Sequence, residues 1–316
     1  MKRILFKLLF LLFGTAFFTT LVLGILHAGD LRKYGFRHIP KNNLSNSKCY
    51  NAKMDHLAHS GNFKNCSFLV AGSSMALNNI DGENIAKETG ETVYNISSWG
   101  FKPSQVKLLL EKLNTQKIKN VLLAFNNIDF GKASIDIDYT ATEDFIKEKG
   151  LINEWYFFSK LNIQTFSSDW KYRSQFSEIN NSYNSLKFDD YGSILFDRQG
   201  FTIDSTRWKA YADTSGFNYF SNVLDQLSDE CGKAGSKLIL VYLPAREDLL
   251  TPKYKMENEY VAKVLQNKYK NDFIDLHAIA FSKENFCDGT HLFKEGAEFA
   301  TRIILDSLST RKLMLK

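Results

Sequence analysis

The chain has 316 residues, 44% of them hydrophobic, which is enough to bury the core of one large domain or two small ones. Its formal net charge of +5 is mild, and the basic residues form no long run. Nucleic acid is therefore a poor candidate for a partner.

The N-terminus predicts a membrane anchor. Residues 8–26 carry no charge and are rich in Leu and Phe, and three basic residues precede them. A span of about 20 apolar residues matches the hydrocarbon thickness of a bilayer. A cleaved signal peptide has a shorter apolar region and a small-residue cleavage site, which Leu26-His27-Ala28 does not supply. We therefore expect residues 1–27 to form an uncleaved signal anchor, a single transmembrane helix.

The basic residues before the span favour a cytoplasmic N-terminus and so an extracytoplasmic domain, although three basic residues behind the span weaken the asymmetry. Cysteine usage fits that compartment and matches no zinc spacing. The four cysteines are Cys49, Cys66, Cys231 and Cys287. A disulfide and buried free thiols are both compatible with this pattern.

Residues 28–63 are polar and form a predicted stem before a domain over residues 64–316. Short unbroken apolar runs inside that domain are typical of strands buried on both faces of a parallel sheet. These runs are 66–71, 92–96, 120–125, 237–243 and 273–276. Patterns with a period near 3.6 predict helices over 106–113, 217–231, 260–269 and 296–308. The alternation predicts an α/β domain, a three-layer sandwich around a central, mostly parallel sheet.

The stretch 131–213 breaks this alternation and is dense in aromatic residues. We interpret it as an insertion folded over the carboxyl edge of the sheet. Flat aromatic rings match the faces of sugars, but a hydrophobic core of the insertion itself is the favoured interpretation, with one or two rings left to line a cleft.

Two motifs at the ends of the domain carry the chemistry. Gly72-Ser73-Ser74 follows the first strand directly, and ligands bind beyond the carboxyl ends of parallel strands. Asp288 and His291 stand three residues apart, a spacing that lets the carboxylate accept the ring Nδ1–H and leaves Nε2 as a base. Taken singly, each motif is more readily a capped turn or a surface loop. In this order they outline a serine nucleophile, a histidine base and a carboxylate that orients it.

These residues resemble the four sequence blocks of the SGNH (GDSL-like) hydrolases, a family named for Ser, Gly, Asn and His. The first block has the Gly-Ser-Ser form common among membrane-anchored members, which implies Ser74 as the nucleophile. The second resembles Asn95–Gly100, so the backbone N–H groups of Ser74 and Gly100 would form part of the oxyanion hole. Asp288 and His291 match the fourth block, and the family fold would be a flavodoxin-like sandwich.

The third block departs from the family pattern. Gly-x-Asn-Asp is usual, whereas this chain has Asn126-Asn127-Ile128-Asp129. The resemblance implies Asn127 as the side-chain oxyanion donor, with Asn126 as the alternative. Loss of one such donor typically costs about 10²–10³ in rate, so the mismatch implies a slow enzyme or a different geometry.

Other titratable residues are weaker candidates. His56 and His59 stand at i, i+3, but without a third ligand nearby an exposed helix face is favoured over a metal site. Asp275 and His277 at a predicted strand end favour a structural role, and Arg246 is a minor candidate for reaching the site. We expect no metal and no cofactor.

The resemblance covers roughly residues 64–130 and 214–310 and leaves the insertion out. It implies a membrane-anchored, serine-dependent O-acyl (acetyl) transferase or esterase that acts on an extracytoplasmic polysaccharide through an acyl-serine. The implied partners are the membrane, a cell-surface polysaccharide or other glycan, and a multi-spanning acyltransferase. The alternative is a catalytically inactive glycan-binding or scaffold subunit of a polysaccharide-modifying complex, and the unusual third block would be its sign.

Overall fold

A five-stranded sheet, parallel throughout, organises the folded domain in the order β2-β1-β3-β4-β5. The structure is a computed structural model that describes residues 2–34, 44–113, 117–131, 135–147, 187–198 and 215–311, without the side chains of residues 20–34. The strands are β1 (Phe68–Gly72), β2 (Val93–Asn95), β3 (Asn120–Phe125), β4 (Lys237–Tyr242) and β5 (Phe273–Asp275). Each overlaps one of the five predicted apolar runs, so the predicted α/β class and the parallel sheet are confirmed.

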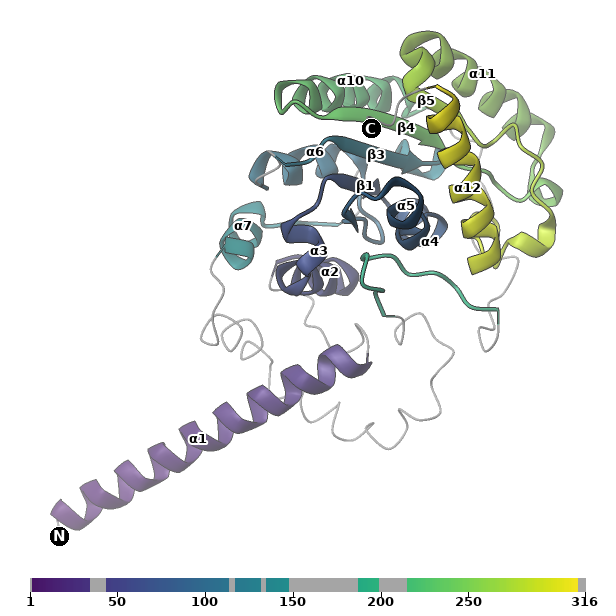
Figure 1. The fold of residues 1–316 in the computed structure, drawn as a ribbon. Helices are drawn as coiled ribbons and strands as arrows, with labels where there is room; N and C mark the ends of the chain where they lie inside the picture. Colours follow the sequence, from purple (N-terminus) through teal and green to yellow (C-terminus); the bar gives the residue numbers. More distant parts are fainter. Residues whose placement is uncertain are drawn as a thin grey trace.

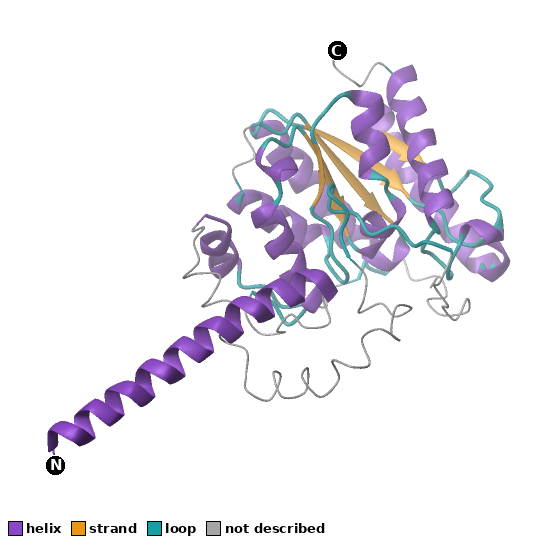
Figure 2. Cartoon of the chain, turned by 60° about the horizontal axis from the view of Figure 1, so that its bottom comes forward, coloured by secondary structure: helices purple, strands orange, loops and turns teal. Residues whose placement is uncertain are grey.

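Helices cover both faces of the sheet, and Figure 2 shows the strands between these helices. Strand residues alternate between two cores: Leu69 and Ala71 join the first, and Phe68 and Val70 join the second. The first core is closed by α2 (Lys48–His59), α6 (Pro103–Lys112), α10 (Phe217–Lys233) and α11 (Pro252–Tyr269). The second is closed by α4 (Ser74–Asn79), α5 (Gly82–Thr89) and α12 (Lys294–Thr310), which lie together on one side in Figure 1. Burial on both faces explains why the strands are continuous in apolar residues.

The four predicted helices correspond to α6, α10, α11 and α12, each two to eight residues longer at one or both ends than its apolar pattern, and α6 ends one residue earlier than predicted. Pro103 opens α6, and the hydroxyl of Thr251 caps α11 just before Pro252. Proline suits a first helical turn because the missing N–H has no partner there. Short 3-10 turns complete the described connections: η2 (Asn127–Asp129), η5 (Glu247–Leu249), η6 (Lys270–Asp272) and η7 (Lys283–Asn285).

The second half of the predicted stem belongs to the folded domain. Helix α2 and the short α3 (Gly61–Lys64) precede β1, and Tyr50, Met54 and Leu57 lie in the same core as Leu69. The folded unit therefore begins before residue 64, by residue 44. All four cysteines are buried free thiols, which settles the alternative left by the sequence.

The N-terminal segment is one continuous helix, α1 (Lys2–Tyr34), which stands apart from the domain in Figure 1. Its described side chains, residues 2–19, are exposed. Within the part of the chain whose side chains are described, no helix combines the length and the apolar character needed to cross a bilayer. The predicted apolar span 8–26 runs on into the undescribed side chains, so the transmembrane helix stays a prediction.

Of the predicted insertion 131–213, the structure describes residue 131, residues 135–147 with α7 (Tyr139–Lys147), and residues 187–198. The rest of this prediction lies outside the described residues. Segment 187–198 lies along the carboxyl ends of β2 and α4: the Asn95 N–H donates to Tyr191 O (2.7 Å) and the Ile194 N–H donates to Leu77 O (3.0 Å).

Candidate active site

A glycine lets β1 turn directly into α4. Gly72 has φ +145°, and a Cβ there would stand 2.3 Å from the carbonyl oxygen of Ala124 and 2.8 Å from the Cβ of Ala76. No other residue fits this close approach to β3. The turn therefore places the next two serines at the carboxyl edge of the sheet.

The two serines have different surroundings. The Ser73 hydroxyl is buried and accepts the N–H of Met75 (3.2 Å), so Ser73 is the N-cap of α4. Ser74, the first residue of that helix, is partly exposed. Of the two hydroxyls, only that of Ser74 is open to a ligand.

The predicted carboxylate–imidazole pair is present. Asp288, fully buried, accepts the ring Nδ1–H of His291 through Oδ2 (2.7 Å). Its Oδ1 accepts the backbone N–H groups of Thr290 and His291, both at 2.8 Å. The ring is thus oriented from one side, and Nε2 has no hydrogen-bond partner within the described part of the chain. The ring of Phe196 also packs edge-on against the imidazole, with centroids 6.1 Å apart.

Asn79 joins the serine-bearing helix to the histidine-bearing loop. At the last position of α4, its amide donates to the carbonyl of Thr290 (3.0 Å), and its Oδ1 accepts the N–H of Leu292 (2.8 Å). The two hydrogen bonds bracket His291. Asn79 therefore links the helix that carries Ser74 to the loop that carries His291, but no hydrogen bond joins His291 Nε2 to Ser74 in this structure.

We predict that Asn79→Ala lowers the free energy of unfolding by about 2–4 kcal/mol, because two buried backbone groups lose their partners. Chemical denaturation of the full chain measures this, with Asn218→Ala on the exposed face of α10 as the control. Equal stability of the two variants would show that the hydrogen bonds of Asn79 contribute nothing.

The second block forms a loop between β2 and α6. Gly100 has φ +72°, in the left-handed region that glycine adopts freely. Asn95 fixes the start of the loop, since its side chain accepts the N–H of Ser97 (3.0 Å) and donates to Ala76 O of α4 (2.9 Å). The loop that carries Gly100 is therefore tied to the helix that carries Ser74.

The third block is engaged inside the fold. The Asn127 amide donates to Asn258 Oδ1, and its Oδ1 accepts the hydroxyl of Tyr242. The Asn126 amide donates to Leu243 O (2.9 Å) and to the next carbonyl along the chain. Both asparagines are buried and support the carboxyl ends of β3 and β4. The oxyanion role of Asn127 stays a prediction.

The ion pair between Lys102 and Asp129 was not predicted from the sequence. Asp129, at the last position of the third block, is buried next to Lys102, with 3.6 Å between Nζ and Oδ1. The family pattern, which ends in aspartate, was the one available signal for Asp129. Lys102 follows Gly100 by two residues and carries no motif of its own.

Arg246 lies beside the Asp288–His291 turn. Its backbone N–H donates to Gly289 O (3.0 Å), and its guanidinium binds Asp248 through contacts of 2.7 and 2.9 Å. To reach into the site as predicted, the Arg246 guanidinium would have to give up its ion pair with Asp248. At the end of β5, Asp275 accepts the backbone N–H of His277 (2.9 Å), in keeping with the structural role expected there.

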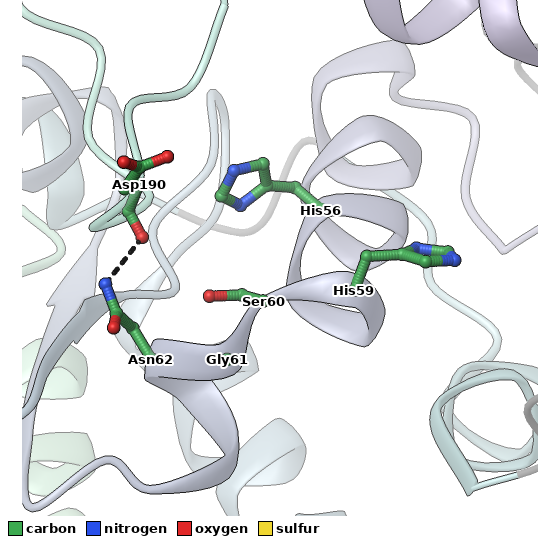
Figure 3. A pocket seen from close by; sticks show the side chains of 6 residues that line it. All are labelled: His56, His59, Ser60, Gly61, Asn62 and Asp190. Carbon is green, nitrogen blue, oxygen red and sulfur yellow. Dashed lines mark hydrogen bonds between the residues drawn. The ribbon is translucent and has the colours of Figure 1, made fainter.

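His56 and His59, the histidine pair of α2, line a cavity of about 340 Å³ at the end of that helix. In Figure 3, His56 and Ser60 are turned toward Asp190, and the ring of His59 points away. His56 does not lie on an exposed face as expected: its Nδ1 is 2.9 Å from the hydroxyl of Tyr94, and burial lowers its pKa to about 4. Among the described residues, no three His, Cys, Asp or Glu side chains are grouped to hold a metal ion.

Neither a protein-family model nor a curated protein matches this chain.

Proposed function

We propose that this chain is a serine-dependent acyl enzyme, an O-acyl (acetyl) transferase or esterase similar to the SGNH hydrolases. The observation that carries the proposal is the Asp288–His291 pair, whose Nε2 has no hydrogen-bond partner among the described residues. A buried nitrogen without a partner is costly, and a catalytic role is one explanation for such a group. Asn79 fastens this pair to the helix that presents the partly exposed Ser74.

The proposed reaction has two halves. His291 Nε2 takes the proton of Ser74, whose Oγ attacks an ester carbonyl, and the alkoxide leaves with the proton from His291. Backbone N–H groups of Ser74 and Gly100, with Asn127 as the predicted third donor, stabilise the oxyanion. The acyl-serine then passes its acyl group to water or to a hydroxyl, again through His291. The Ser74–His291 hydrogen bond must form for this, and such bonds often tighten only when substrate binds.

The proposed cellular location and the proposed substrate are inferred from the sequence. An apolar helix behind basic residues suits a single-pass anchor with the domain on the extracytoplasmic side. By its resemblance to membrane-anchored SGNH proteins, we propose a polysaccharide or other glycan as the acyl acceptor or donor, and a multi-spanning acyltransferase as a partner.

A non-catalytic role is the second candidate, because the third-block amides are engaged inside the fold and the Ser74–His291 bond is not formed. On this alternative, the chain is a glycan-binding or scaffold subunit of a polysaccharide-modifying complex.

A serine-reactive phosphonate probe separates the two candidates. We expect the full chain in detergent to be labelled and to hydrolyse small acetyl esters, because Ser74 is activated by His291. Ser74→Ala should lose both signals, and Ser309→Ala, exposed on α12, should keep both. Labelling that survives in Ser74→Ala, or a wild type that shows neither signal, would favour the non-catalytic role.

A further inference from the structure

A buried ion pair lies beside the turn that presents Ser74. The ammonium of Lys102 is 3.6 Å from Asp129 Oδ1 and also donates to the carbonyl of Ile128. The Lys102 side chain is only 14% exposed, and that of Asp129 only 1%. Taking two charges out of water is expensive, and replacement of such pairs by apolar residues often leaves stability unchanged or raises it. Stability alone is therefore a weak reason for this pair.

The carboxylate of Asp129 interacts with residues from three separate segments of the chain. Its Oδ2 accepts the backbone N–H of Asn126 (3.0 Å), which closes the turn after β3. Burial raises the pKa of Asp129, while the charge of Lys102 and the hydroxyl of Ser73 counteract the shift. Ser73 is the N-cap of α4, and Lys102 is the N-cap of α6. This carboxylate thus contacts the second and third sequence blocks directly, and the Ser73 hydroxyl of the first block lowers its pKa.

The sequence positions of Ser73 and Lys102 indicate which segments of the chain these contacts fix. Ser73 immediately precedes the proposed nucleophile, and Lys102 follows Gly100, a proposed oxyanion donor, by two residues. The second block has a left-handed residue and no regular hydrogen-bonded strand to fix it at this point. Asn95 and Trp99 tie the loop to α4. The ion pair adds a separate connection to the turn after β3, because Lys102 binds both the carbonyl of Ile128 and the carboxylate of Asp129 on η2.

We propose that Lys102 and Asp129 are positioning residues that hold the Ser74 turn and the Gly100 loop at their working separation. This inference rests on the proposed function. A displacement of about 1 Å in a catalytic group can cost roughly 100-fold in rate, so a loosened loop would weaken transition-state binding more than substrate binding. Neither residue touches the reacting atoms, and each acts through the backbone it holds.

The test compares variants of the full chain in acetyl-ester hydrolysis and in the rate of phosphonate labelling. We expect Lys102→Met to lower kcat and the labelling rate by about 10–100-fold with KM within about twofold. Lys102→Arg keeps the charge and should recover most of that loss. Lys119→Met removes a lysine that is 60% exposed and paired with Glu91, and should behave as wild type. Thermal unfolding of each variant shows that it is folded at the assay temperature.

A double variant adds a second readout. Lys102→Met combined with Asp129→Asn should lose no more activity than the worse single variant, because both break the same connection. A folded Lys102→Met with wild-type kcat, or an Arg variant as slow as the Met variant, overturns the inference while the proposed function stands. A wild type that is neither labelled nor active overturns both.

Discussion

Asp288→Asn is expected to lower kcat for acetyl-ester hydrolysis by about 10³–10⁴ while the protein stays folded. In the structure, Oδ2 of Asp288 accepts the ring Nδ1–H of His291. An asparagine that turns its amide toward the ring can only donate, so Nδ1 becomes the acceptor and the proton moves to Nε2. A protonated Nε2 cannot take the proton of Ser74.

The backbone around the turn should survive this change. Oδ1 of Asp288 accepts the N–H groups of Thr290 and His291, and the asparagine carbonyl can accept the same two bonds. Asp306→Asn, exposed on α12, is the matched control. Steady-state kinetics and thermal unfolding measure the two effects separately. An Asp288→Asn variant with more than about a tenth of the wild-type kcat would exclude His291 as the base oriented by Asp288.

The strands were predictable because their signal is local. A strand buried on both faces must be apolar at every position, and β3 is buried at all six. Helix α2 gave no such signal, because its buried face includes Asn51, Lys53 and Asp55. A helix whose buried positions are partly polar shows no clean period of 3.6, so its sequence resembled a stem.

The same contrast holds in the site. The Asp288–His291 contact spans three residues, and spacing alone predicted it. The link from Asn79 to Thr290 spans 211 positions and depends on how α4 and α12 pack. The environment of Asn127 depends on Tyr242 and Asn258, which come from β4 and α11. Such contacts are set by tertiary packing, and a short motif carries no information about them.

Lys53 should make the stability of the domain depend on pH. This lysine of α2 is fully buried, and its ammonium donates to Asn95 O (2.9 Å) and to Gly192 O. It also lies 4.0 Å from the centroid of the Phe188 ring. Burial lowers the pKa of Lys53 to about 7, against smaller opposing effects of Cys49 and Asp189.

An unfolded lysine binds its proton below about pH 10.4, whereas the folded Lys53 binds it only below about 7. Between these values the unfolded state holds more protons, so the free energy of unfolding rises with pH. Below about pH 7 both states are protonated and the contribution becomes constant. We therefore predict that wild type gains about 2 kcal/mol relative to Lys53→Met between pH 7 and 9.

Urea denaturation of the full chain at pH 5, 7 and 9 measures this difference. Lys53→Met leaves the carbonyls of Asn95 and Gly192 without their donor at every pH, a cost that cancels when two pH values are compared. The other titrating groups cancel in the same way, because both proteins carry them. Lys119→Met, in which an exposed lysine is lost, should give a curve parallel to wild type. A Lys53→Met curve that is also parallel to wild type from pH 7 to 9 would mean that Lys53 keeps its proton inside the fold. In that case the carbonyls of Asn95 and Gly192 and the carboxylate of Asp189 compensate its charge far better than their positions imply.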